Sequence, residues 1–241
     1  MTEHSFVDYR RDGTVAYVTL DRPEHSNLVT YAMMTQLVDA LTDAASASVI
    51  VLAANGQDFT LGRDQSERPT GVSPAEALGR INQVNALLHE FAGVSVALVR
   101  GRAVGFGSGV AVNCDITVAA TSAVFGFDEI AHGFPPLVVE AYLADYVPRK
   151  AALDLVLTGR RVGAEEALAL GMVSRVVPDE QLEAAGAELV AGLVAADDRA
   201  LQRAKSFLAE IGGVPPAERP AYGVTELVAW RAAGESVTSR A

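Results

Sequence analysis

Two short, mostly apolar runs that each lead into a glycine-bounded turn constrain the fold of this chain most strongly. Residues 49–53 run into the turn at 56–64, and residues 95–99 run into the glycine-rich stretch at 101–109. Short continuous apolar runs are typical of strands that are buried on both faces of a sheet. Because ligands bind where strands end in α/β sheets, we expect an α/β fold with a site formed by these two turns.

Helical patterns alternate with the strands in the first two thirds of the chain. Residues 15–20 are rich in β-branched side chains and predict a further strand. Thr30 can cap one helix, and the motif of residues 73–76, S-P-A-E, is a capping box with proline at the first helical position. These patterns predict that strands and helices alternate around a shared core.

The last part of the chain is mostly helical in its pattern. Residues 172–177 are the last run that predicts a strand, and residues 181–193, 200–211 and 217–232 predict helices. We therefore expect a core of residues 1–190 and a helical C-terminal region of residues 191–241.

The composition argues against several classes of protein. The formal net charge of −11 over 241 residues disfavours nucleic acid and anionic membranes as partners. No run is long enough to span a membrane, and residues 1–6 lack a signal-peptide pattern. With Cys114 as the one cysteine no internal disulfide can form, so we expect a cytoplasmic protein. The histidines are widely spaced, so no metal site is expected.

The glycines at 105, 107 and 109 do not match the usual nucleotide-binding motifs. Val110 stands where the dinucleotide fingerprint needs its third glycine, no G-K-[ST] follows, and Ser108 is not in a G-x-S-x-G elbow. The segment still joins the end of a strand to the start of a helix through closely spaced glycines. Such a segment presents outward-facing backbone N–H groups, which can bind an anion or an oxyanion. Glycines that only allow tight strand–helix packing are the alternative interpretation.

An ordered set of motifs spans most of the chain. These are T-L-D-R-P at 19–23 with Asn27, D-F-T-L-G-R-D at 58–64, G-R-A-V-G-F-G-S-G at 101–109 with N-C-D at 113–115, F-G-F-D-E-I at 125–130, and L-T-G at 157–159 with G-M-V-S-R-V-V at 171–177. Together they resemble the enoyl-CoA hydratase/isomerase (crotonase) superfamily. The resemblance implies a spiral of ββα units with a C-terminal helical trimerisation region. It also implies a homotrimer or hexamer and an acyl-CoA thioester as substrate, with coenzyme A part of that substrate and no other cofactor.

The resemblance also implies roles for particular residues. The backbone N–H groups of Arg63 and Phe106 would form an oxyanion hole for the thioester carbonyl, and Glu129 would exchange a proton with carbon. The alternative for Glu129 is a solvated acid at a helix start. The substrate-binding residues that the resemblance implies are Leu28, Thr60, Gly62, Asp64, Gly105, Gly107, Gly109, Ile130 and Pro136.

The chain departs from the family pattern at three positions. Gly109 stands where hydratases carry a glutamate, Leu137 where dienoyl-CoA isomerases place an acid, and Asp128 where a proline is usual. One carboxylate with an oxyanion hole resembles the Δ3,Δ2-enoyl-CoA isomerases, in which one glutamate moves a proton between two carbons. Glu140 is a second candidate acid, although a solvated helical position fits it as well.

We therefore expect double-bond isomerisation of an enoyl-CoA through an enolate. Other interpretations stay open. They are an enoyl-CoA hydratase, another reaction that uses the same oxyanion hole (decarboxylation, C–C bond formation or thioester hydrolysis), and a non-catalytic acyl-CoA-binding paralogue.

Overall fold

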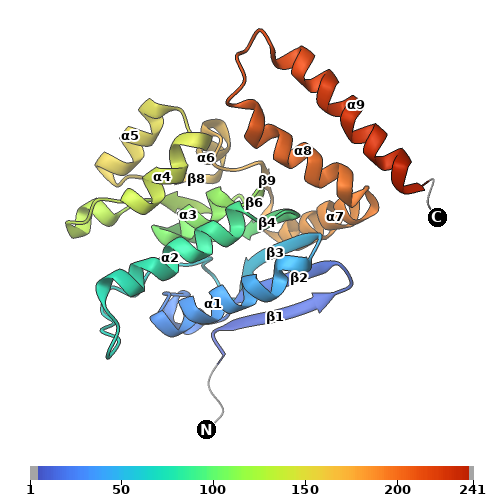
Figure 1. The fold of residues 1–241 in the computed structure, drawn as a ribbon. Helices are drawn as coiled ribbons and strands as arrows, with labels where there is room; N and C mark the ends of the chain where they lie inside the picture. The colour runs from blue at the N-terminus through green and yellow to red at the C-terminus, as the bar shows by residue number, and fades with distance from the viewer. Residues whose placement is uncertain (1–4, 239–241) are drawn as a thin grey trace. The chain divides into compact units, whose positions relative to one another are not determined.

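The computed structural model describes residues 5–238, and the side chains of residues 5–233, in two compact units. The first unit is Met1–Asp198 and contains all the strands of the described chain (Figure 1). The second unit is Arg199–Ala241. The α/β fold class predicted from the sequence is confirmed. Helix α7 (Leu182–Ala195), which spans the domain boundary expected after residue 190, belongs to the first unit.

The larger sheet has six strands in the order β1-β2-β3-β4-β6-β9. They are β1 (Val7–Asp12), β2 (Val15–Leu20), β3 (Val49–Ala54), β4 (Val94–Val99), β6 (Ile116–Ala120) and β9 (Arg175–Val177). Only β1 is antiparallel to its neighbour, and the other pairings are parallel. Strands in parallel sheets are covered on both faces, which explains why β3 is a continuous apolar run and why β4 is apolar except for Ser95.

A second, smaller sheet has three strands in the order β5-β7-β8. They are β5 (Arg102–Val104), β7 (Val124–Gly126) and β8 (Arg161–Gly163). Strand β7 pairs parallel with β5 and antiparallel with β8. Neither β5 nor β8 is among the strands that the sequence pattern predicts, because three residues are too few to show a period.

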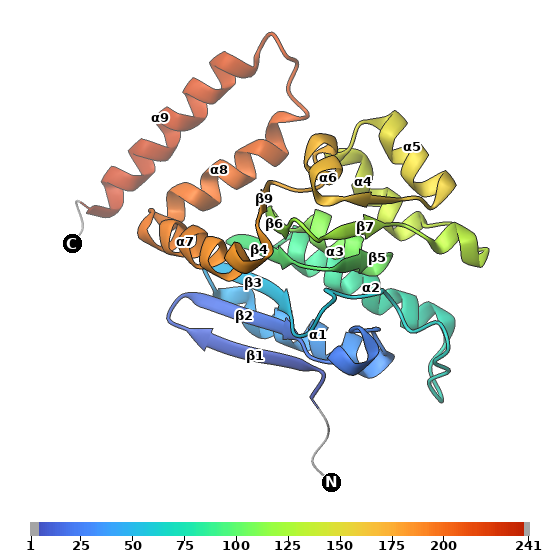
Figure 2. The same cartoon turned by 180° about the vertical axis from the view of Figure 1, so that it is seen from behind.

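Helices cover both faces of the larger sheet. The first unit holds α1 (Tyr31–Asp43), α2 (Pro74–His89), α3 (Phe106–Asn113), α4 (Leu137–Tyr146), α5 (Arg149–Thr158), α6 (Ala164–Leu170) and α7. Seen from opposite sides, Figures 1 and 2 place α1 and α2 on one face of the sheet and α7 on the other. Successive strand side chains point to opposite faces, so Ala97 and Val99 join the main core, whereas Leu98 packs against Gly186 of α7.

Both predicted helix caps are confirmed. The Thr30 hydroxyl accepts a hydrogen bond from the Met33 N–H (3.1 Å), and the Ser73 hydroxyl accepts one from the Glu76 N–H (3.2 Å). Each cap satisfies a donor that the first helical turn would otherwise leave free. The caps fix where α1 and α2 begin, and both helices follow loops that lead to the site described below.

The second unit consists of α9 (Arg219–Thr238) and of α8 (Asp198–Ile211) from its second residue onward. The rings of Phe207 and Tyr222 stack with centroids 5.8 Å apart, and the Arg203 guanidinium donates to Glu210 and Glu226. In the described part of the chain no helix is long and apolar enough to cross a membrane.

Candidate functional site

The loop after β3 runs beside the start of β5. The Thr60 N–H donates to the Arg102 carbonyl and the Val104 N–H donates to the Thr60 carbonyl, both at 3.0 Å. On its other side the loop pairs with Val29, whose N–H donates to the Gly62 carbonyl and whose carbonyl accepts from the Asp64 N–H (both 2.9 Å). In this parallel bridge the N–H of Arg63 points away from Val29.

Two glycines allow the two predicted turns to approach each other. Gly62 has φ +85°, and a Cβ there would lie 2.8 Å from the Val104 carbonyl oxygen and 3.6 Å from the Phe106 nitrogen. Gly105 has φ +53°, and a Cβ there would lie 3.0 Å from Glu129 Oε1. Backbone in this left-handed region favours glycine, and at Gly62 the contact with the Val104 carbonyl also leaves no room for a side chain. Gly62 therefore adjoins the Phe106 amide, and Glu129 lies against Gly105.

Two backbone N–H groups are free at this junction. Phe106 is the first residue of α3, and the first N–H groups of a helix have no intrahelical acceptor. Among the described residues, neither the Arg63 N–H nor the Phe106 N–H donates to a protein acceptor. Two fixed donors on neighbouring segments are what an oxyanion hole needs.

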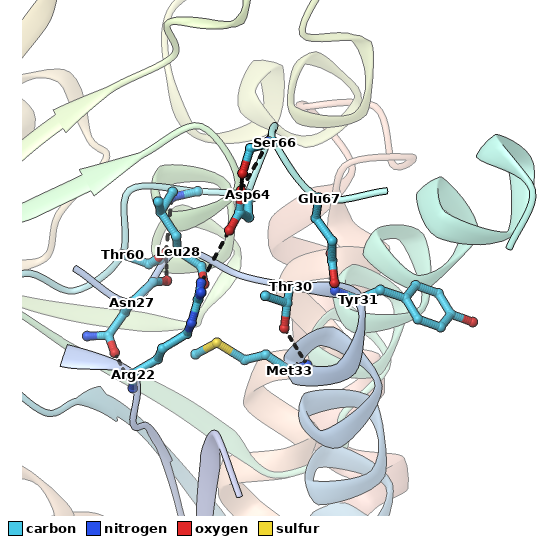
Figure 3. A network of polar contacts seen from close by, with 11 residues as sticks. Arg22, Asn27, Leu28, Thr30, Tyr31, Met33, Thr60, Asp64, Ser66 and Glu67 are labelled. Atoms are coloured by element: carbon cyan, nitrogen blue, oxygen red, sulfur yellow. Dashed lines mark hydrogen bonds and ion pairs between the residues drawn. The ribbon is translucent and has the colours of Figure 1, made fainter. Parts of the chain in front are cut away.

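A polar network holds the loop in place (Figure 3). Arg22 donates to the Leu28 carbonyl (2.8 Å) and pairs with Asp64 (3.4 Å), whose carboxylate accepts from the Ser66 hydroxyl (2.6 Å). The hydrogen bond from Ser66 lowers the pKa of Asp64, and Arg22 adds to this effect although burial opposes it. Asp64 is therefore ionised near neutral pH and serves to hold the loop.

Thr60 acts inside the same loop. Its hydroxyl donates to the Asn27 carbonyl (2.6 Å) and accepts from the Gly62 N–H (3.0 Å), as Figure 3 shows in part. These bonds satisfy the Gly62 N–H internally, so the next amide, that of Arg63, is the one left free.

The carboxyl group of Glu129 is held in a poorly solvated position. Glu129 begins a short 3-10 helix, Glu129–His132, and its Oε2 is buried without a hydrogen-bond partner in the described part of the chain. Burial raises the pKa of Glu129, and the charge of Asp128 raises it further, whereas its own backbone amide and His132 oppose the rise. A carboxyl group with a raised pKa is a stronger base than an ordinary glutamate and is suited to proton exchange with carbon.

A cavity of about 710 Å³ brings most of the predicted site together. Its walls include nine of the twelve residues to which the sequence assigned a catalytic, oxyanion-hole or substrate-binding role: Leu28, Gly62, Arg63, Asp64, Gly105, Phe106, Gly109, Glu129 and Pro136. The rest of the lining combines aliphatic residues such as Leu78, Ile81 and Val139 with polar ones such as Arg102 and His132. An apolar cavity with a few convergent polar groups is typical of a small-molecule site.

Three residues predicted to bind substrate do not line this cavity. Thr60 is fully buried and packs against Gly107, where a Cβ would lie 2.6 Å from the Thr60 methyl carbon. Both therefore support the wall from behind. Ile130 is 39% exposed and lies against Gly159, where a Cβ would meet its Cγ2 at 3.3 Å.

The departures from the family pattern are also placed by the structure. A Cβ at Gly109 would lie 3.2 Å from Val139 Cγ2, so this position faces an aliphatic wall. Leu137 lines the cavity, as does Asp128, which pairs with Arg161 (3.5 Å). Glu140 is exposed and lies off the cavity wall.

Two residues at the site, Asn85 and Arg22, could not be assigned to it from the sequence. Asn85 of α2 lies on the cavity wall, yet a lone asparagine in a helical pattern gives no signal. Arg22 was seen only as part of a motif, and its pairing with Asp64 joins residues 42 positions apart. Within residues 5–238, no group of three or more His, Cys, Asp or Glu side chains is arranged to hold a metal ion.

The environment of Glu129 leads to a prediction about stability. Because burial raises the pKa of Glu129 in the folded chain, the folded state holds the proton more tightly, and stability is lost as pH rises through the raised pKa. Glutamine carries no charge at any pH. We therefore expect Glu129→Gln to melt at a higher temperature than the wild type at pH 7.5, with a smaller difference at pH 4.5.

Differential scanning fluorimetry at both pH values measures this effect. Glu140→Gln, at an exposed position on α4, is the matched control. If Glu129→Gln differs from the wild type in melting temperature by the same amount at both pH values, the claim that burial raises the pKa of Glu129 is contradicted.

Comparisons with known proteins agree with this geometry. Residues 10–211 match the model of the family described as Enoyl-CoA hydratase/isomerase. A Thermus thermophilus protein named after enoyl-CoA hydratase is 37% identical over 174 residues, which is 69% of each chain. A Legionella pneumophila structure described as an enoyl-CoA hydratase/isomerase (crotonase) superposes with a TM-score of 0.87 at 25% identity, over 94% of this chain and 91% of that one.

A third similar protein was solved with a ligand. It is a Thermobifida fusca protein named after enoyl-CoA hydratase, in complex with CoA. It superposes with a TM-score of 0.85 at 30% identity, over 96% of this chain and 95% of the other.

Proposed function

Because this chain belongs to the enoyl-CoA hydratase/isomerase family and has the crotonase fold, we propose that it isomerises the double bond of an enoyl-CoA thioester. The observation that carries the proposal is the set of reactive groups that the site contains. One poorly solvated carboxyl group, Glu129, lies against Gly105 beside two free backbone N–H groups, and position 109 has no second carboxylate. The similar protein that was solved with CoA supports a CoA thioester as the ligand.

The chemistry requires one base and one oxyanion hole. The Glu129 carboxylate takes a proton from C2 of a 3-enoyl-CoA, and the electron pair moves into the thioester carbonyl to give a dienolate. The N–H groups of Arg63 and Phe106 stabilise the negative oxygen. The same carboxyl group then returns the proton to C4, which leaves the double bond between C2 and C3. No step is assigned to a metal or a nicotinamide.

Water addition needs a further group. A hydratase must also orient and deprotonate a water molecule, and Gly109 has no side chain for this task. Val139, at 3.2 Å from a Cβ placed at Gly109, is aliphatic and cannot replace a carboxylate. The exposed Glu140 is off the cavity wall. The proposal therefore favours isomerisation over hydration.

Two substrates distinguish these activities. We expect the wild type to convert 3-hexenoyl-CoA to 2-hexenoyl-CoA. Hydration of crotonyl-CoA should be slow by comparison, because it needs a second carboxylate that the site does not have. Chromatographic separation of the thioesters measures both rates. Rapid hydration of crotonyl-CoA would favour the hydratase, whereas no turnover of either thioester despite binding would favour a non-catalytic acyl-CoA-binding protein.

We also propose that the chain assembles as a trimer or hexamer through its C-terminal helices. Leu208 of α8 is 74% exposed, and Val224, Leu227 and Val228 of α9 are also largely exposed. Apolar side chains gathered on two helices favour association, because burying them removes apolar surface from water.

Light scattering tests this assembly. At micromolar concentration we expect a mass three or six times the 25.2 kDa of the chain. Leu208→Glu places a charge on the exposed face of α8 and is expected to lower that mass, whereas Gln83→Glu on the exposed face of α2 is the control. A 25.2 kDa wild-type particle would contradict the proposal.

A further inference from the structure

Asn85 is a buried polar residue of the cavity wall that the chemistry above does not use. Asn85 is 4% exposed and is one of three buried residues on α2, where the other two, Val84 and Leu88, are aliphatic. Burying an amide that finds no hydrogen-bond partner costs about 1–3 kcal/mol, so a buried asparagine calls for an explanation.

The side chain of Asn85 faces the cavity. Leu78, Ile81 and Asn85 all line it, and their spacing of three and four residues places them on one stripe of α2. Among the described residues no side-chain hydrogen bond involves the Asn85 amide group, and its oxygen and nitrogen are not among the fully buried unpaired atoms, so the group reaches the cavity surface. Its backbone carbonyl accepts from the Asn113 side chain (3.0 Å), which ties this turn of α2 to α3. The free polar group is therefore available to a ligand.

A small recess opens beside this amide. Asn85, Gly109 and Val139 line both the main cavity and a recess of about 10 Å³, which Val112, Tyr142 and Leu143 complete. That volume is close to the ~10–15 Å³ of probe-occupied space that one water molecule needs. The absence of a side chain at Gly109 keeps the recess open, since a Cβ there would already lie 3.2 Å from Val139. Its size matches a hydroxyl group.

The geometry points to a substrate whose acyl chain carries a hydroxyl group that enters this recess and hydrogen-bonds to Asn85. The amide can donate to a hydroxyl oxygen or accept from its proton, so it suits this neutral group. Apart from Tyr142 the recess is lined by glycine and aliphatic residues, and no described side chain hydrogen-bonds to the amide, so an unsubstituted acyl chain would leave Asn85 without a partner on the ligand. This inference rests on the proposed acyl-CoA function and adds a specificity-determining residue to the same site.

Binding of unreactive CoA thioethers tests the inference without turnover, because 4- and 5-hydroxyacyl thioesters cyclise to lactones and a 3-hydroxyacyl thioester can be dehydrated. The probes are S-hexyl-CoA, its 3-, 4-, 5- and 6-hydroxy derivatives and the methyl-branched analogues, all titrated by calorimetry beside hexanoyl-CoA. We expect at least one hydroxy derivative to bind about tenfold tighter than S-hexyl-CoA, as one net hydrogen bond allows, and to bind tighter than its methyl analogue. Asn85→Leu is expected to abolish that advantage, and Gly109→Ala, which fills the recess, is expected to reduce it.

Three results would overturn the hydroxyl recess alone. The first is equal affinity for hydroxylated and unsubstituted chains. The second is a methyl group that raises the affinity as much as the hydroxyl does. The third is a higher affinity for the hydroxylated chain that persists in Asn85→Leu. Failure of hexanoyl-CoA itself to bind contradicts the proposed acyl-CoA function, and the inference falls with it. The two failures are therefore distinguishable in one set of titrations.

Discussion

Glu129→Gln is expected to lower the isomerisation turnover of 3-hexenoyl-CoA by about 10²–10⁴-fold, the range that a general acid–base group typically supplies. Glutamine keeps the shape of the side chain but cannot accept the C2 proton. The oxyanion hole is made of backbone N–H groups, so binding of the CoA thioester should persist. Steady-state kinetics together with calorimetric titration measure the two effects separately.

The control for this variant is Glu140→Gln, because Glu140 is exposed and does not line the cavity. Its turnover should equal that of the wild type. The assignment of Glu129 is wrong if Glu129→Gln retains full turnover, or if Glu140→Gln loses turnover to a similar degree.

Gly62→Ala is expected to reduce turnover by about 10²–10³-fold, which is the usual cost of losing one oxyanion-hole donor. A Cβ at residue 62 would lie 2.8 Å from the Val104 carbonyl oxygen and 3.6 Å from the Phe106 nitrogen. The loop must therefore shift, and the free N–H groups of Arg63 and Phe106 move relative to each other. The loss should appear in kcat, because the donors act most strongly on the charge that develops in the transition state.

Gly71→Ala is the matched control for backbone strain. Gly71 has φ +77°, similar to the +85° of Gly62, but a Cβ there meets nothing within 4 Å. Both variants should lose thermal stability, because alanine is disfavoured in this region of backbone conformation, and Gly62→Ala should lose more because its Cβ also meets the Val104 carbonyl oxygen. Equal loss of turnover in the two variants would show that strain, rather than displacement of the amides, causes the effect.

The sequence could predict the parts of the fold that depend on local patterns. Strand β3 is a continuous apolar run and β4 is apolar except for Ser95. Thr30 and Ser73 cap their helices through contacts three residues away. Strands β5 and β8 were missed because their three residues are ordered by pairing with β7, a contact between distant segments. β1 was also missed, since its second half, from Arg10 to Asp12, is charged.

For the candidate site too, the sequence could predict what depends on local pattern but not what depends on contacts between distant segments. The two glycine turns could be proposed from their place after buried strands, and nine of the expected residues do line one cavity. Thr60 and Gly107 belong to the right segments, but the sequence could not show that they pack against each other behind the wall. Asn85 was missed because its importance lies in what surrounds it, namely Gly109 and Val139 from two other helices.

The central claim is that Glu129 alone exchanges protons with the carbons of the bound thioester. Incubation of 3-hexenoyl-CoA in D₂O, followed by mass spectrometry of substrate and product, measures this exchange directly. The account predicts that the wild type forms 2-hexenoyl-CoA and introduces deuterium at C2 or C4, and that Glu129→Gln does neither at a comparable rate. A wild type that leaves both carbons unlabelled and forms no product, or a Glu129→Gln variant that exchanges as fast as the wild type, would contradict the claim.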